Sequence, residues 1–283
     1  MPKNNQSNSR LSRNFHKTFI PERHYINSLM RYAASGKSGN YQEIAAVTNI
    51  PTGESSGKAP AILDYCRGMG LVQLSGKGPS KIKQPELTPF GRIVFKEDPF
   101  LKERITQWIA HFNLCGPQRG ADVWFHTFFS GGQTLSMGFT KKRLEEYLAV
   151  VYGTQKTNFI GPLLRMYEEE SSFRTCGVLT TNNDNISRQQ APTTDEFGLA
   201  YSAWILQLIM DHFSEYGQVT VTELDSKAGL RAIPGWDIQN FQRILNLVEQ
   251  KGTIEIDRHM NPWILRPKTT VDEVWVRIYE DLI

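Results

Sequence analysis

Residues 41–74, YQEIAAVTNIPTGESSGKAPAILDYCRGMGLVQL, decide the expected fold. Apolar side chains at helical spacing predict one helix over residues 41–48 and a second over residues 58–69. A turn rich in Pro and Gly separates them, and glycines end the second helix. The alternating run at 72–74, followed by GKGP, predicts a strand that turns into a basic hairpin. This order indicates a winged helix-turn-helix, a module that docks on duplex DNA or serves as a protein adaptor.

The same order of elements returns near the end of the chain. Residues 200–213 predict an apolar helix, residue 221 begins a short one, and Asp237 caps a long helix that runs to residue 250. Alternating residues at 253–257 then predict a second hairpin. The duplication is one of architecture and not of sequence. Because the long helix has only Arg243 outward among acidic neighbours, we expect this unit to pack on a partner or on the rest of the chain, with DNA contact as the alternative.

Length and periodicity together predict the domain organisation. A chain of 283 residues is long enough for two or more cores, and helical spacing continues through the middle of the sequence. The expected fold class is mainly α, with two winged helix-turn-helix units flanking a helical middle domain. The expected parts are a basic arm at 1–14, an N-terminal winged-helix domain at 15–98, a helical domain at 99–175, a linker or loop at 176–196 and a C-terminal winged-helix domain at 197–283.

The distribution of charge points to a polyanionic partner for the first third of the chain. The formal net charge is only +3, but residues 1–100 hold 14 Lys and Arg against 7 Asp and Glu, whereas residues 199–283 hold 8 against 12. Neutralising phosphates requires clustered cations. We therefore expect DNA to meet the N-terminal part of the chain.

Composition also predicts the compartment. The N-terminus is polar and basic without an apolar core segment, so it does not resemble a signal peptide. No apolar run approaches the roughly 20 residues that cross a bilayer. The three cysteines, Cys66, Cys115 and Cys176, are far apart and form no CxxC pair. These features predict a cytoplasmic protein without a membrane partner and without a disulfide framework.

The DNA-contacting side chains are expected on the second helix, on the hairpin and in the N-terminal segment. The start of the helix at residue 58 offers free amides to a phosphate, and lysines on the hairpin would straddle the backbone. Few side chains face a base edge, so only modest sequence readout is expected. The predicted contacts are Arg10, Arg13, Lys17, Arg23, Ser55, Ser56, Lys58, Ala61, Tyr65, Lys77, Lys81 and Lys83.

Two weaker patterns could carry metal chemistry. His111 and Cys115 are four residues apart, and with His126 they suggest zinc, but a fourth ligand is missing. Asp122 and His126, together with the acidic run at 168–170, could hold Mg²⁺ for phosphodiester cleavage. Buried His and Cys on apolar helices and solvated acidic runs are the commoner explanations. No metal site and no catalytic residue is assigned, and the only cofactor considered is Mg²⁺ for a nickase.

Three short motifs resemble a known family. They are FHKTFIPER at 15–23, WIAHFNLC at 108–115, and Trp124 followed by Phe128. They are similar to the bacterial domain-of-unknown-function family 4007, whose members are associated with DNA phosphorothioation and phage-defence gene clusters, the Ssp-type protein B being the functional counterpart. The resemblance implies a DNA-handling subunit of a multi-protein system. It carries over no catalytic residues.

Three functions follow from these patterns. The first is a DNA-binding subunit of a phosphorothioation system that docks duplex DNA by its N-terminal winged helix. The second is a metal-dependent nickase of the same system, and the third is a winged-helix transcriptional regulator or adaptor. The expected partners are double-stranded DNA and other subunits of the modification complex, and a homodimer is also considered.

Overall fold

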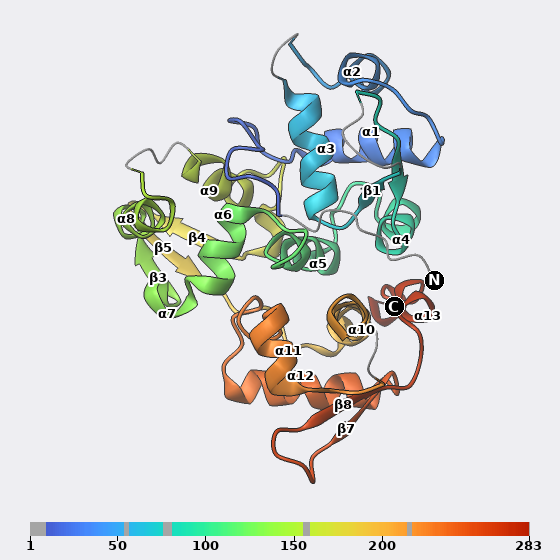
Figure 1. Ribbon diagram of the computed structural model, residues 1–283, viewed down its shortest axis with the longest axis vertical. Helices are drawn as coiled ribbons and strands as arrows, with labels where there is room; N and C mark the ends of the chain where they lie inside the picture. The colour runs from blue at the N-terminus through green and yellow to red at the C-terminus, as the bar shows by residue number, and fades with distance from the viewer. Residues whose placement is uncertain (1–9, 54–56, 76–80, 155–158, 214–216, 283) are drawn as a thin grey trace. The chain divides into compact units, whose positions relative to one another are not determined.

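The computed structural model describes residues 10–53, 57–75, 81–154, 159–213 and 217–282. The chain divides into two compact units, Met1–Arg188 and Gln189–Ile283. Helices dominate, but three small antiparallel sheets accompany them (Figure 1). The fold is therefore mixed α/β and not mainly α. Within the described ranges, no helix combines the length and the apolar composition needed to cross a membrane.

The first unit opens with helices and a short hairpin: α1 (Arg23–Ala34), α2 (Tyr41–Thr48), α3 (Lys58–Gly68), β1 (Val72–Leu74), β2 (Pro85–Leu87) and α4 (Pro89–Glu97). Local capping explains where these helices start. The Asn40 side chain accepts hydrogen bonds from the amides of Gln42 and Glu43 at the start of α2. Thr88 caps α4, whose first residue is a proline. The predicted bounds of α2 and β1 are confirmed.

The remainder of the first unit is helical with one three-stranded sheet. The elements of this part are α5 (Arg104–Leu114), α6 (Asp122–Phe125), η1 (His126–Ser130), α7 (Gly132–Leu135), β3 (Gly138–Thr140), α8 (Lys141–Tyr152), α9 (Ile160–Glu168), η2 (Arg174–Cys176), β4 (Leu179–Asn182) and β5 (Asn185–Arg188). The three strands form an antiparallel sheet in the order β3-β5-β4.

Two predicted parts of this unit need correction. Residues 179–188, predicted as part of a linker or loop, form the β4–β5 hairpin, in which Ile186 is buried between exposed polar neighbours. The described part of the predicted basic arm is built into the fold. Leu11 pairs with Ala121 as a parallel bridge, and its amide donates to the carbonyl of Gly120 at 2.8 Å. The polar composition of residues 179–188 concealed a local strand pairing, whereas the Leu11 bridge depends on a residue far away in the sequence.

The second unit surrounds a buried helix. Its elements are η3 (Asp195–Phe197), α10 (Gly198–Phe213), β6 (Val219–Thr220), α11 (Val221–Ala228), α12 (Ile238–Gln250), β7 (Ile254–Asp257), β8 (Ile264–Pro267), α13 (Val271–Trp275) and η4 (Glu280–Leu282). The strands form an antiparallel sheet in the order β6-β8-β7. Trp204 of α10 is buried, and Asp237 caps α12 as predicted.

Candidate nucleic-acid interface

Helix α3 exposes much less of its surface to solvent than its sequence suggested. Ala61 and Tyr65 are fully buried, and the Tyr65 hydroxyl donates to the carbonyl of Phe19 at 3.1 Å. The prediction that these two residues face DNA is wrong. The segment at residues 15–20 packs on that side of α3, so the helix is covered on more than the one face that its apolar spacing indicated (Figure 1).

The predicted DNA contact Lys58 instead binds other side chains of the first unit. Its ammonium lies 2.7 Å from the Glu22 carboxylate and 4.7 Å from the centre of the Tyr25 ring. Only 17% of its side chain is exposed. Because an ion pair and a cation–π contact already satisfy this charge, Lys58 holds the start of α3 against α1 and is not placed for a phosphate.

Two predicted arginines are also anchored internally. Arg10 Nε lies 2.9 Å from the Asp122 carboxylate, and its guanidinium stands 4.0 Å from the centre of the Phe125 ring. Arg23 Nη2 donates to the carbonyl of Glu170 at 2.6 Å. These contacts join residues more than a hundred positions apart in the sequence. Both arginines therefore tie the N-terminal segment to the helical part of the unit.

Four predicted contacts remain, and they are Arg13, whose guanidinium lies 5.2 Å from the centre of the Tyr152 ring, and Lys17, Lys81 and Lys83. Lys17 and Lys81 are exposed, and the Lys83 ammonium stands 5.8 Å from the centre of the Tyr41 ring. Burial raises the pKa of Asp64 on α3, while the charges of Arg67, Lys83 and Lys17 counteract that rise. Lys17 and Lys83 therefore both lie near Asp64. Ser55, Ser56 and Lys77 lie outside the described residues.

Sequence reasoning missed two cations in the same region. Gly39 and Lys83 exchange two backbone hydrogen bonds, at 2.9 and 2.8 Å, so the loop that carries the exposed Lys37 lies beside the hairpin. Arg67 on α3 pairs with Asp64 at 2.7 Å and keeps 40% of its side chain exposed. No local signal could have placed Lys37, because the pairing is tertiary. We call the set Lys17, Lys37, Arg67, Lys81 and Lys83 the basic face.

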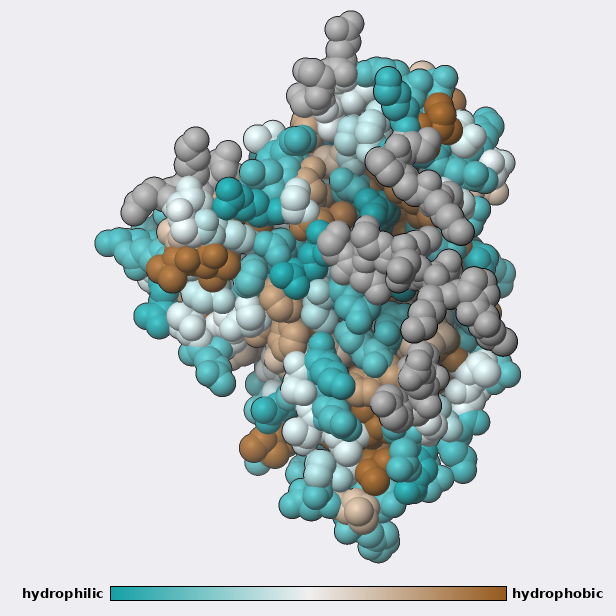
Figure 2. All heavy atoms as spheres, in the orientation of Figure 1, coloured by the Kyte–Doolittle hydropathy of each residue, from teal (hydrophilic) through white to brown (hydrophobic). Residues whose placement is uncertain are grey.

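The surface elsewhere in the view is mostly hydrophilic, with scattered apolar patches (Figure 2). One patch lies over α8, where Val150 is 83% exposed. Single exposed apolar residues are ordinary.

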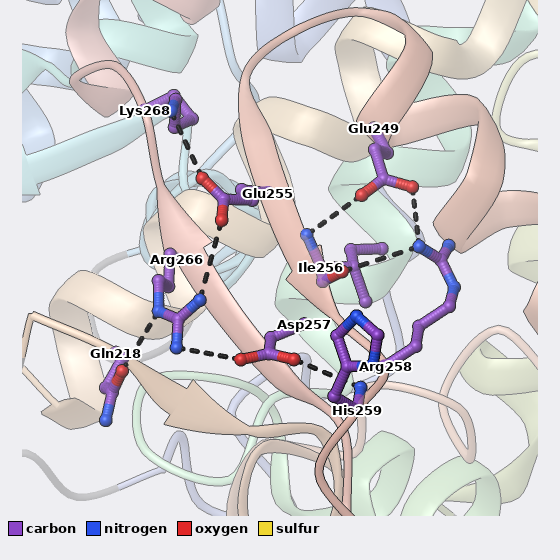
Figure 3. A network of polar contacts seen from close by, with 9 residues as sticks. All are labelled: Gln218, Glu249, Glu255, Ile256, Asp257, Arg258, His259, Arg266 and Lys268. Carbon is purple, nitrogen blue, oxygen red and sulfur yellow. Dashed lines mark hydrogen bonds and ion pairs between the residues drawn. The ribbon is translucent and has the colours of Figure 1, made fainter.

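The charged side chains of the hairpin in the second unit are paired with one another or with α12 (Figure 3). Its cations are matched by carboxylates on the same hairpin or on α12, which reduces their availability to phosphates. Its ion pairs are Arg266–Asp257 at 3.0 Å, Arg266–Glu255 at 3.5 Å, Lys268–Glu255 at 3.1 Å and Arg258–Glu249 at 2.6 Å.

The residues of the three motifs meet in one buried cluster. The rings of Phe15 and Trp124 lie 6.0 Å apart, and those of His111 and Phe128 lie 4.7 Å apart. The Tyr167 hydroxyl lies 2.7 Å from His111 Nδ1 and accepts from Trp124 Nε1 at 3.0 Å. Burial lowers the pKa of His111 well below its usual value. The cluster is a hydrogen-bonded core, and the buried Arg188 lies beside it with its guanidinium 5.2 Å from the centre of the Phe128 ring.

The arrangement gives no support to the two metal patterns. Burial raises the pKa of the Cys115 thiol well above its usual value, so it stays protonated beside His111. Asp122 is engaged by Arg10 and lies 3.7 Å from His126. Across the part of the chain that the structure describes, no three His, Cys, Asp or Glu side chains gather in a way that could hold a metal ion.

Comparison with known proteins identifies the family. Residues 16–161 match the model of a family described as a protein of unknown function (DUF4007). The chain belongs to this family. The match confirms the resemblance drawn from the three motifs, and the matched residues include the basic face together with His111, Trp124 and Phe128 of the buried motif cluster.

Two solved structures share the fold of this DUF4007 protein. They are described as "Magnesium ion-bound SspB crystal structure" and "SspB crystal structure", with TM-scores of 0.62 and 0.61. Each is 14% identical, and each alignment covers 98% of this chain and 90% of the other. No curated protein matches the chain.

The motif residue His16 predicts a pH dependence of stability. Burial lowers its pKa from 6.5 to about 4 in the folded state. Between these values the unfolded chain binds more protons, so stability is lost as the pH falls from 6.5 towards 4. The loss between pH 7 and pH 5 is expected to be about 2 kcal/mol from His16. Urea unfolding at both pH values measures this loss of stability.

The control variant is His16→Gln. Because His111 acts in the same direction, this substitution should remove only part of the pH dependence. An unchanged pH dependence would contradict the assignment of the loss to His16.

Proposed function

We propose that this chain is a DNA-binding subunit of a bacterial DNA phosphorothioation and phage-defence system. In this proposal it docks duplex DNA on the basic face of its first unit and works with other subunits in the cytoplasm. The basic face carries the proposal, because it brings together cations from the N-terminal segment, the α1–α2 loop, α3 and the hairpin. Clustered cations of this kind supply the salt-dependent part of DNA affinity.

The fold supports the same function. The likeness to SspB extends over 98% of the chain, and the motifs resemble a family associated with phosphorothioation clusters. We interpret α1-α2-α3-β1-β2 and α10-β6-α11-α12-β7-β8 as two winged helix-turn-helix units. In the first unit, DNA would lie across the hairpin and the segment around Lys17, since α3 itself offers only a narrow exposed edge. A homodimer is compatible with this arrangement.

A metal-dependent nickase is the second candidate. The observation in its favour is that one of the similar structures is described as magnesium ion-bound. In this chain Asp122, the carboxylate that sequence reasoning favoured, is paired with Arg10 at 2.9 Å. A nickase would therefore have to use other carboxylates or free Asp122 from that ion pair. DNA binding without cleavage is the better supported function.

A plasmid experiment separates the two candidates. Purified protein is incubated with supercoiled plasmid without metal and with Mg²⁺ or Mn²⁺, and both mobility shift and nicking are scored. We expect a shift that needs no metal and weakens with salt, and no conversion to the open-circular form. Metal-dependent nicking would favour the second candidate. The absence of both a shift and nicking would contradict both.

A further inference from the structure

Helix α12 of the second unit exposes a row of amide and guanidinium side chains. Their spacing of three, four and seven residues places them on one face of the helix. The opposite face carries the buried Ile244, Leu245 and Val248. We call the exposed row the amide stripe, and its members are Gln239, Gln242, Arg243, Asn246 and Gln250.

The amide stripe keeps its polar groups available. A groove of about 420 Å³ runs along it, lined by its members together with Asp195 and Leu247. Asn246 Oδ1 accepts from Arg258 Nη2 at 2.7 Å, which leaves the amide N–H groups of Asn246 free to donate. The other four side chains make no hydrogen bond or ion pair with any residue in the described ranges.

These residue types match the edges of bases. Gln and Asn form paired hydrogen bonds with adenine in the major groove, and Arg forms them with guanine. A helix of 13 residues is about 20 Å long and fits the major groove. The corresponding helix of the first unit differs, since α3 exposes only parts of Pro60, Asp64 and Arg67 beyond Lys58, and Arg67 is bonded to Asp64.

Topology places α12 where a reading helix belongs. The order helix, strand, helix, helix, hairpin, with the central position of β8 in the sheet β6-β8-β7, puts α12 third among the helices, directly before the hairpin. That is the recognition position of a helix-turn-helix followed by a wing. We propose that α12 is the base-reading helix of this chain and that its amide stripe contacts adenine and guanine edges in duplex DNA. This inference rests on the proposed function.

In this proposal the two units contribute different parts of DNA recognition. Residues 199–283 hold 8 basic against 12 acidic residues, so the second unit adds little attraction for phosphates. The basic face of the first unit supplies affinity that is independent of sequence, and the amide stripe supplies discrimination between sequences. Removing the stripe should therefore change sequence preference and leave the affinity for arbitrary DNA nearly intact.

The test uses the full-length protein and a randomised duplex library. Selection yields a preferred duplex, and the ratio of the dissociation constant of a scrambled duplex to that of the preferred duplex measures discrimination. Replacing Gln239, Gln242 and Arg243 together by Ala should reduce this ratio roughly 10- to 100-fold. Affinity for the scrambled duplex should change less than about threefold, because at most one cation is removed. Arg243→Lys, which keeps the charge but cannot form the paired hydrogen bonds, should reduce discrimination as well.

Matched controls make the outcomes distinguishable. Replacing Gln133, Gln189 and Arg104 by Ala removes the same side-chain types from exposed positions outside α12 and should leave discrimination unchanged. If selection yields no preferred duplex although DNA is bound, or if the stripe variant keeps full discrimination, α12 does not read bases and the stripe serves another partner. If no duplex is bound at all, the proposed function itself is wrong.

Discussion

Reversing the charges of Lys17, Lys81 and Lys83 together to Glu is expected to weaken binding of duplex DNA roughly 100- to 1,000-fold at about 100 mM salt. Lys17 and Lys83 both lie near Asp64 of α3, and Lys81 precedes Lys83 by two residues. Each phosphate that the variant no longer neutralises should also reduce the slope of log affinity against log salt by about 0.9, so the slope should fall by nearly 3. Fluorescence anisotropy with a labelled duplex at several salt concentrations measures both quantities.

A control of equal charge separates local contact from the general field of the protein. Lys96, Lys102 and Lys141 are exposed lysines outside the basic face, and reversing them changes the net charge by the same amount. Their reversal should weaken binding less than about tenfold, because screened charges beyond about 10 Å contribute little at this salt. Equal effects of the two triple variants would show that DNA does not dock on the basic face.

Replacing Tyr167 by Phe is expected to lower the free energy of unfolding by about 2–4 kcal/mol. Its hydroxyl accepts from Trp124 Nε1 and pairs with His111 Nδ1 in a cluster that water does not reach. Because the oxygen accepts from the indole, its own hydrogen is available to His111, which agrees with a neutral imidazole. The substitution leaves Trp124 Nε1 without its acceptor and leaves His111 Nδ1 with only the Cys115 sulfur at 3.5 Å. Each such loss costs about 1–3 kcal/mol. Urea unfolding at pH 7 measures the loss.

The control for this variant is Tyr147→Phe. The Tyr147 hydroxyl lies 3.4 Å from Ser130 Oγ near the surface, so its loss should cost less than about 0.5 kcal/mol. Folded Tyr167→Phe protein should bind DNA with the affinity of the unaltered protein, because the motif cluster is structural. A stability loss no larger than that of Tyr147→Phe, or a loss of DNA affinity in folded protein, would contradict this role.

The sequence predicted those features of the fold that depend on side chains close together in the chain. The bounds of α2 and β1 and the Asp237 cap of α12 follow from side chains within a few residues of each boundary. The burial of Tyr65 and the position of Lys37 were not predictable in this way. The first depends on residues 15–20 lying against α3, and the second on the backbone pairing of Gly39 with Lys83.

The candidate site was predictable only in part. The excess of cations in residues 1–100 pointed to the unit that carries the basic face, but charge alone did not separate Lys81 and Lys83 from Arg10, Arg23 and Lys58, whose internal partners are far away in the sequence. The amide stripe was visible as a spacing of Gln, Arg and Asn in the sequence. The prediction for the second unit used only its acidic charge, and it left out the hydrogen bonds that the neutral amides of the stripe can form with bases.

The most direct test of the account is the salt dependence of DNA affinity for the unaltered full-length protein. Dissociation constants for a duplex of arbitrary sequence are measured between about 50 and 200 mM salt. Docking on the basic face predicts binding whose log–log slope is about −3 or steeper, from at least three phosphate contacts. No binding at 50 mM salt, or a slope near zero, would show that the basic face does not hold DNA.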